Sequence, residues 1–355
     1  MNDPMCKSAS GNDTKIILVT GGAGFIGSNF IRYILSHYQD CKVINFDKLT
    51  YAGNLYNLAE ANKNPHYVFV KGDVFVSRDV KNVFEQFNPD YVVHFAAESH
   101  VDRSIINPDV FLQTNIMGTQ NVLKFAREYQ IKKFVQISTD EVYGSIEAGK
   151  QASEEDGMNP NNPYAASKAA ADLLTRVAHQ TYGLNVNIVR SCNNFGPHQF
   201  PEKLIPLLLN NLQEDNDLPI YGQGKNIREW MFVEDNCCAI DLVLNHGKSG
   251  EIYNVGSGNC WENIEIATFL LAQFPQTKAN IKFVTDRPGH DFRYSMNSDK
   301  IRRELGWQPQ SDLKSGLLQT INWYQNQLDW IEKIRSGEYM KYYDQNYSHR
   351  MTETV

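Results

Sequence analysis

Tyr164 and Lys168 have the residue types and the spacing of a pair that could catalyse the oxidation of an alcohol. They follow Pro163 and are four residues apart, a separation that places two side chains on one face of a helix. A nearby lysine ammonium is expected to lower the pKa of the phenol from about 10 toward neutrality. The phenolate could then take a hydroxyl proton while hydride leaves for a nicotinamide. Taken alone, such a pair more often lies on a surface, so its context must decide.

Asp140 and Glu141 are adjacent acids at the end of an apolar run that closes with Thr139. Two such acids in a loop are usually only solvated. The carboxyl end of a strand in a doubly wound sheet, however, faces the ligand crevice. Two carboxyl groups held in different environments can divide acid and base work between them. Dehydration requires both, because a base must take a carbon-bound proton and an acid must protonate the departing hydroxyl.

A glycine-rich turn, Thr20 to Gly27, comes after the first apolar run. Glycine permits a tight turn and close approach of the backbone to a pyrophosphate, and the following helix offers its N-terminus to the phosphates. Asp47 comes twenty residues after Gly27, where a carboxylate can bind the adenosine ribose and repel a 2′-phosphate. We therefore predict NAD rather than NADP. A glycine turn without a ligand is the weaker interpretation.

These residues need a scaffold, and the sequence predicts one of alternating strands and helices. This rhythm predicts an α/β, Rossmann-type doubly wound parallel sheet, with a smaller α/β C-terminal substrate lobe. Patterned helices are expected at Ile26–Tyr38, Val80–Phe87, Val110–Tyr129, Ala165–Tyr182 and Leu204–Gln213. Strands are expected at Ile16–Thr20, Val43–Asp47, Tyr67–Gly72, Tyr91–Ala96, Phe134–Thr139 and Val186–Arg190.

The rhythm changes after Arg190, which suggests two domains. We expect an NAD-binding domain over 14–192 with 226–256 returning to it. A nucleotide-sugar lobe would comprise 193–225 and 257–340. Residues 1–13 and 341–355 are expected to be tails, the first of them disordered.

Composition excludes several classes of protein. The net charge is −7 and no Lys/Arg-rich run occurs, which argues against a nucleic-acid partner. No apolar run approaches the roughly 18–20 residues that span a bilayer. The six cysteines show no CxxC pair and no zinc spacing, so no metal is expected. Free thiols fit a reducing cytoplasm.

Together these motifs resemble the extended short-chain dehydrogenase/reductase superfamily, and more closely the dTDP-glucose 4,6-dehydratases. The resemblance runs from about Lys15 to Trp323. Related epimerases generally carry small or hydroxylated residues where this chain has Asp140 and Glu141, so that pair is the most discriminating feature. The matching runs are Phe46–Asn54, Ala96–Ser104, Ser138–Gly144, Tyr164–Lys168, Asn193–Pro197, Pro201–Pro206, Gly224–Arg228 and Asp286–Asp291.

The resemblance implies an NAD-dependent cycle on dTDP-glucose. Tyr164, assisted by Thr139 and Lys168, deprotonates the C4 hydroxyl as hydride leaves C4. Glu141 removes the C5 proton, and Asp140 protonates the departing C6 hydroxyl. Asp140 must therefore hold a proton near neutral pH, so its pKa is predicted to be raised. Hydride returns to C6, which regenerates NAD⁺.

The resemblance also implies the binding residues and a homodimer. The two helices at 110–129 and 165–182 would pair across a two-fold axis. Arg228 and Arg287 are the preferred diphosphate ligands, since a guanidinium binds phosphate oxygens in pairs. Substrate-binding residues are expected to be Ser99, Thr139, Asp140, Glu141, Asn193, Lys203, Leu204, Pro219, Tyr221, Arg228, Asn263, Arg287 and His290. Cofactor-binding residues are expected to be Gly21, Gly24, Phe25, Ile26, Gly27, Asp47, Lys48, Leu49, Thr50, Asp73, Val74, Phe95, Ala96, Ala97, Ser99, Thr114, Tyr164, Lys168 and Asn194.

Alternatives remain open at this point. A UDP- or CDP-hexose 4,6-dehydratase would use the same chemistry. An epimerase or decarboxylase would lack the division of labour between Asp140 and Glu141, and an NAD-binding sensor would be expected to lose catalytic residues. The chain also departs from its relatives, with Glu229 before Trp230 where aspartate is common, Phe195 where tyrosine is usual, and Cys192 in place of a small residue.

Overall fold

The computed structural model describes residues 14–334. The predicted tails at 1–13 and 341–355 lie outside the described residues, as does the end of the predicted lobe. The largest element is a seven-stranded sheet in the order β10-β6-β5-β4-β1-β2-β3, in which every neighbouring pair is parallel. Its strands are β1 (Lys15–Thr20), β2 (Cys41–Asp47), β3 (Tyr67–Lys71), β4 (Tyr91–His94), β5 (Lys133–Thr139), β6 (Val186–Ser191) and β10 (Ile252–Val255).

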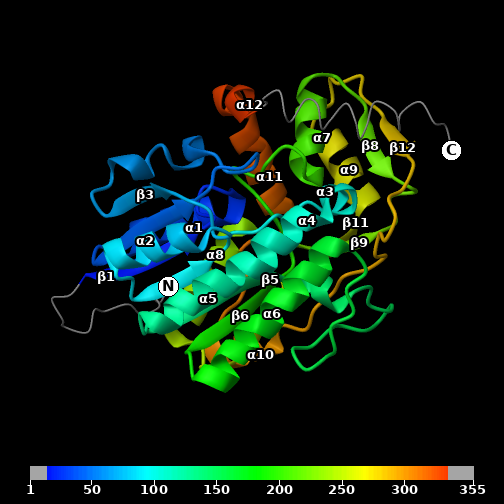
Figure 1. Ribbon diagram of the computed structural model, residues 1–355. Coiled ribbons are helices and arrows are strands. Elements are labelled where there is room, and N and C mark those ends of the chain that lie inside the picture. The colour runs from blue at the N-terminus through cyan, green and yellow to red at the C-terminus, as the bar shows by residue number, and fades with distance from the viewer. Residues whose placement is uncertain (1–13, 335–355) are drawn as a thin grey trace.

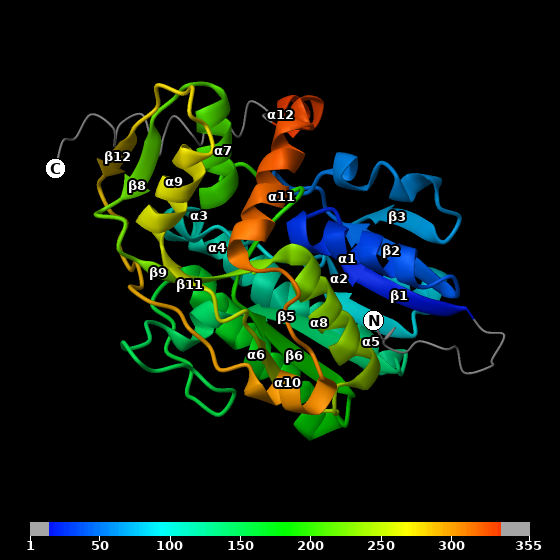
Figure 2. The ribbon, with the colours of Figure 1, turned by 180° about the vertical axis from the view of Figure 1, so that it is seen from behind.

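Helices cover both faces of this sheet, which confirms the predicted fold class (Figure 1). On one face, α2 (Ser77–Phe87), α5 (Thr119–Glu128) and α6 (Pro163–Tyr182) pack side by side. On the other, α1 (Phe25–His37) packs on α8 (Val233–His246), with α10 (Asp299–Leu305) beside β10 (Figure 2). The central strands are buried because both faces of the sheet are covered, and β5 is buried along its whole length.

A second group of strands and helices gathers beyond the carboxyl edge of the sheet: α7, α9, α12, β8 and β12 lie in the upper part of both ribbon views, and β9 and β11 lie below them (Figures 1 and 2). They form a three-stranded sheet, β11-β9-β7, and a parallel pair, β12-β8. The second core cluster packs α7, α9, α11 and α12 around these strands. The bounds are β7 (Asn193–Phe195), α7 (Leu204–Gln213), β8 (Leu218–Tyr221), β9 (Ile227–Phe232), β11 (Cys260–Glu262), α9 (Asn263–Ala272), β12 (Ile281–Val284), α11 (Leu313–Gln325) and α12 (Leu328–Ile334).

The returning segment 226–256 divides between the two parts of the molecule. Its α8 and β10 belong to the large sheet, whereas β9 pairs with β7 and β11. The chain therefore crosses between the two parts more than once, and polar groups on the joining loops come together at the sheet edge.

The helix predicted at 110–129 is wrong in detail. The structure has α4 (Pro108–Phe111), a π-helical segment η3 (Leu112–Gly118) and then α5, with α3 (Val101–Ile106) before them. Asn115, at the centre of η3, accepts a hydrogen bond from Glu98 N at 2.8 Å and donates to Glu98 O at 3.0 Å. These side-chain bonds hold the wider turn that periodicity alone does not predict.

Shorter 3₁₀ turns complete the chain between the main elements. The turn η4 (Asp140–Tyr143) follows β5 directly, while η1 (Leu55–Leu58) and η2 (Ala61–Lys63) follow β2. β4 ends at His94, two residues earlier than predicted. No helix within residues 14–334 is long and apolar enough to cross a membrane.

Candidate active site

The glycine-rich turn between β1 and α1 is closely packed. Gly21 has φ +68°, and a Cβ there would lie 2.5 Å from Ala96 N, so only glycine fits this position. The N-cap of α1, Gly24, makes no side-chain capping bond. The first N–H groups of α1 therefore remain available to an anion, as a phosphate-binding helix start requires.

Asp47, at the end of β2, holds this turn in place. Its carboxylate accepts hydrogen bonds from Ala23 N at 2.9 Å and from Leu49 N at 2.7 Å. Burial raises the pKa of Asp47, although these two amide bonds oppose the rise. The arrangement fits the ribose end of a dinucleotide, with the carboxylate fixed between the turn and the loop after β2.

The same turn is braced by α12, the last helix in the part of the chain that the structure describes. Ala23 O accepts hydrogen bonds from Asn54 N and from Asn57 Nδ2, both at 2.9 Å. Trp330 of α12 then donates its indole N–H to Asn57 Oδ1 at 2.9 Å. A helix near the end of the described chain thus fixes a loop next to the first helix.

One pocket runs along the carboxyl ends of the large sheet and contains most of the predicted site residues. All predicted cofactor-binding residues except Leu49 line it, and so do Thr139, Asp140, Glu141, Asn193 and Lys203. Sequence reasoning assigned no binding or catalytic role to several further lining residues. These are Phe46, Ala52, Gly53, Gly72, Glu98, Ile137, Ser138, Ser191, Cys192, Gln199, Phe200 and Glu202.

Tyr164 and Lys168 are buried on the first turns of α6, which Asn162 caps by accepting a hydrogen bond from Ala165 N at 2.8 Å. Burial lowers the pKa of Lys168 to about 8, and its ammonium donates to Ile137 O. Burial, followed by the charge of Glu141, raises the pKa of Tyr164. Our expectation that the pKa of Tyr164 falls toward neutrality is therefore wrong for this structure, because burial and the charge of Glu141 both raise it.

Asp140 and Glu141 occupy different environments. Asp140 is 3% exposed, and its Oδ2 is buried without a hydrogen-bond partner among the described residues. Burial, with the charges of Glu141 and Glu229, raises the pKa of Asp140 well above its usual range. This direction agrees with the prediction that the pKa of Asp140 is raised. Thr139 Oγ1 donates to the other oxygen, Asp140 Oδ1, at 3.2 Å.

Glu141 is held by two side chains that sequence reasoning missed. Asn162 Nδ2 and Tyr294 OH each lie 3.4 Å from Glu141 Oε2. The single phenolic hydrogen of Tyr294 is shared with Asp291 Oδ2, which lies closer, at 2.7 Å. The sequence signal for Asn162 was its position before Pro163 at a helix start, whereas Tyr294 carried no comparable signal.

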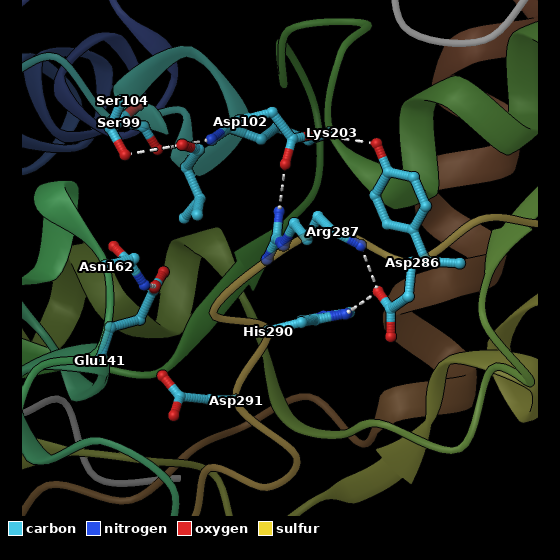
Figure 3. Close-up of polar contacts among 12 residues, drawn as sticks. Ser99, Asp102, Ser104, Glu141, Asn162, Lys203, Asp286, Arg287, His290 and Asp291 are labelled. Carbon is cyan, nitrogen blue, oxygen red and sulfur yellow. Dashed lines mark hydrogen bonds and ion pairs between the residues drawn. The ribbon is translucent and has the colours of Figure 1, made fainter. Parts of the chain in front are cut away.

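Arg287 and His290 lie beside this region on the loop after β12 (Figure 3). Arg287 donates to Asp102 Oδ1 at 3.1 Å, and Tyr221 donates to Asp102 Oδ2 at 2.9 Å. His290 Nδ1 lies 2.6 Å from Asp286 Oδ1, and burial with the nearby Arg287 lowers the pKa of His290 to about 4. Arg287 therefore reaches from the outer part of the molecule to α3 of the large-sheet part.

Other predicted substrate residues lie outside the pocket lining. Arg228 donates to Ile227 O and Asp291 O, both at 2.8 Å, so its guanidinium supports the backbone. Leu204 begins α7, Pro219 lies in β8 and Asn263 begins α9. Leu49, which was predicted to bind the cofactor, also lies outside the pocket lining, and its backbone N–H donates to Asp47.

Comparison with known proteins identifies the family. The family model for GDP-mannose 4,6 dehydratase matches residues 18–320. A dTDP-glucose 4,6-dehydratase of Shigella flexneri is 45% identical over 94% of this chain and 99% of its own. One from Haemophilus influenzae is 49% identical over 87% of this chain and 97% of its own. The chain belongs to the dTDP-glucose 4,6-dehydratase family.

A solved member of this family has the same fold. DesIV, the dTDP-glucose 4,6-dehydratase from Streptomyces venezuelae, has a TM-score of 0.87 and 47% identity, and the match covers 90% of this chain and 99% of DesIV. That structure was solved with NAD and TYD bound. The family membership agrees with the resemblance inferred from the sequence motifs.

Proposed function

We propose that this protein is an NAD-dependent dTDP-glucose 4,6-dehydratase. It would oxidise the hexose at C4, eliminate water across C5 and C6, and return hydride to C6 to give dTDP-4-keto-6-deoxy-glucose. The observation that carries this proposal is the buried Asp140, whose pKa is raised and whose Oδ2 is unpartnered in the pocket, next to Glu141. An enzyme that only oxidises and reduces the sugar needs no such pair of carboxyl groups. The presence of Asp140 and Glu141 therefore favours dehydration over epimerisation.

Tyr164, Thr139 and Lys168 would carry out the first step, the oxidation at C4. Tyr164 accepts the C4 hydroxyl proton, and Lys168, whose pKa of about 8 leaves it largely protonated at neutral pH, stabilises the phenolate. When bound, NAD supplies the hydride acceptor for C4, the hydride donor for C6 and a cationic ring that favours phenolate. The residues that fit its two ends are the glycine turn with Asp47 and the sheet-edge residues around Tyr164.

Glu141 and Asp140 would carry out the proton transfers of the elimination. Oxidation at C4 acidifies the C5 proton, which Glu141 takes while Asn162 and Tyr294 keep its carboxylate in position. Asp140 gives its proton to the C6 hydroxyl, which leaves as water. Glu141, which now holds the proton, returns it to C5 after hydride reaches C6. The proton that Tyr164 took from the C4 hydroxyl replaces, directly or through solvent, the one that Asp140 gave to the departing water.

The nucleotide is assigned to the region around Arg287, which lies close enough to Glu141 for the two charges to interact. Arg287 would bind diphosphate oxygens, and the Tyr221 and His290 rings, 6.2 Å apart at an edge-to-face angle, would border the base. Thymidine follows from the family alone. A UDP- or CDP-hexose dehydratase remains the alternative that the experiment must separate.

The test is parallel incubation of the purified holoenzyme with dTDP-, UDP- and CDP-glucose, with product mass as the readout. Loss of one water from dTDP-glucose alone, without net formation of reduced cofactor, is the expected result. Equal water loss from UDP- or CDP-glucose would reassign the base. No water loss from any of them would overturn the dehydratase assignment.

We also propose a homodimer that works in the cytoplasm. Apolar side chains project from two neighbouring helical segments, Leu112 and Met117 on η3 and Leu173 and Val177 on α6, and each is 46–51% exposed. A two-fold axis beside these segments would bury them. The five cysteines in the described part of the chain are free thiols, which suits a reducing compartment. Light scattering of wild type and Leu173→Lys tests the dimer: the parent must have twice the mass of the variant.

A further inference from the structure

Three segments that border the pocket are tied together by the side chains of Tyr51, Arg103 and Glu202. Tyr51 lies on the loop after β2, Arg103 on α3, and Glu202 on the loop before α7. The guanidinium carbon of Arg103 lies 3.8 Å from the centroid of the Tyr51 ring, and Arg103 Nε donates to Glu202 Oε2 at 3.0 Å. Tyr51 also meets the Phe200 ring edge-on, with centroids 5.6 Å apart.

The tie is largely removed from solvent, which makes it costly to open. The Glu202 side chain is 1% exposed and that of Arg103 is 24% exposed. Burial, followed by the charges of Glu202 and Glu98, raises the pKa of Tyr51 well above its usual range, so this ring remains neutral. Removing one partner of such a pair leaves an uncompensated buried charge, a strongly unfavourable change.

The chain on either side of this tie forms pocket wall. Thr50, Ala52 and Gly53 line the pocket from the loop after β2, while Phe200 and Lys203 line it from the loop before α7. A second bond joins the same segments, because Lys203 Nζ donates to Ser99 O at 2.8 Å, two residues before α3. A ligand seated on the glycine turn and Asp47 is therefore enclosed between loops that are fastened to each other.

We propose that Tyr51, Arg103 and Glu202 form a clasp that retains NAD in the pocket between turnovers. The identity of the ligand rests on the proposed function. A reaction that returns its hydride to the product needs no exchange of cofactor, so closure over NAD costs the cycle nothing. The sugar nucleotide is assigned to the Arg287 side and can enter and leave while the clasp stays closed.

The experiment measures exchange of bound NAD in the holoenzyme, using isotopically labelled NAD in solution and mass spectrometry of the bound fraction. Arg103→Met removes the charge and keeps much of the side-chain volume, and Glu202→Gln removes the partner charge. Each is expected to release NAD at least tenfold faster than the parent. The matched control is Arg293→Met, because Arg293 ties Glu147 O and Lys150 O, at 2.9 and 2.8 Å, away from this pocket. The control is expected to stay within twofold of the parent.

A double variant, Arg103→Met with Glu202→Gln, separates a clasp from general loosening. If the two residues act together, it releases NAD about as fast as the faster single variant. Multiplicative effects, or a release rate for both single variants within twofold of the parent, would overturn the clasp. Should Arg103→Met fail to fold, Glu202→Gln and Tyr51→Leu carry the same comparison.

Failure of the clasp and failure of the proposed function give different results. NAD exchange requires no sugar, so a protein with the expected exchange rates but without water loss retains the clasp and loses the dehydratase assignment. Normal dehydration with unchanged exchange in the variants would overturn the clasp alone. A parent protein that binds no NAD would overturn both.

Discussion

Replacing Asp140 by asparagine tests the division of labour in the candidate site. Asparagine keeps the size of the side chain but cannot deliver a proton to the C6 hydroxyl. Positioned general acids contribute about 10²–10⁴-fold, and Asp140 is buried with its Oδ2 unpartnered, so we expect water loss to slow by about that factor. Oxidation at C4 should change little, because Tyr164 and Lys168 are untouched.

The two effects separate in a single-turnover experiment with dTDP-glucose. In the parent, reduced nicotinamide forms and disappears within the cycle. In Asp140→Asn, the absorbance of reduced nicotinamide should rise at a normal rate and then persist, while water loss followed by mass lags behind. Asp299→Asn, which removes an exposed carboxylate at the start of α10, should behave as the parent.

The raised pKa of Asp140 also sets the direction of its pH dependence. Burial favours the neutral form of the Asp140 carboxyl. The neutral carboxyl therefore makes its full contribution to the free energy of unfolding below the pKa of Asp140 in the unfolded chain, about 3.9. That contribution is lost as pH rises through the higher folded pKa. The rate of elimination should decline over the same pH interval. At pH 8, the Tm of Asp140→Asn should be at least as high as that of the parent.

Two results would refute this reasoning. If Asp140→Asn eliminated water within a few-fold of the parent rate, Asp140 would not be the acid. If it instead failed to form reduced nicotinamide, the substitution would have damaged the oxidation step, and the assignment of separate roles would be wrong.

Further predictions concern positioning, substrate binding and the glycine turn. Tyr294→Phe removes one of the two hydrogen bonds to Glu141, so exchange of solvent deuterium into C5 should slow by about tenfold while NAD content stays constant. Arg287→Lys loses paired donation to phosphate and should raise the Kd for dTDP, measured by calorimetry, by about tenfold or more; an unchanged Kd would exclude Arg287 from the diphosphate site. Gly21→Ala places a Cβ 2.5 Å from Ala96 N at φ +68°, so bound NAD should be lost and the Tm lowered. Full NAD occupancy in that variant would contradict the packing argument.

The sequence predicted the glycine turn, the adjacent acids Asp140 and Glu141, and the sheet that carries them, because their signals are local. Apolar runs end in Thr139 and Asp47, glycines mark the turn at 21–27, and one helical turn separates Tyr164 from Lys168. In a parallel sheet these strand ends meet at one edge, so local patterns were enough to bring distant residues together. The raised pKa predicted for Asp140 agrees with the structure, where burial is its main cause.

Long-range side-chain contacts were not predictable in this way. Tyr294 reaches Glu141 across 153 residues of sequence, and Arg287 reaches Asp102 across 185, and no periodicity encodes either meeting. The rise in the pKa of Tyr164 was not predicted, because the sequence shows the nearby Lys168 but not how deeply the phenol is buried. The π-helical turn was missed because Asn115 overrides the apolar pattern with its own hydrogen bonds.

The brace between Trp330 and Asn57 has a consequence for how the protein matures in the cell. These residues are separated by 273 positions, so the ribosome has made most of the chain before the indole can reach the loop beneath it. The large sheet can begin to fold earlier, since its first six strands are complete by Ser191. We therefore expect a nascent chain to assemble its sheet first and to acquire tight dinucleotide binding last, after α12 has emerged.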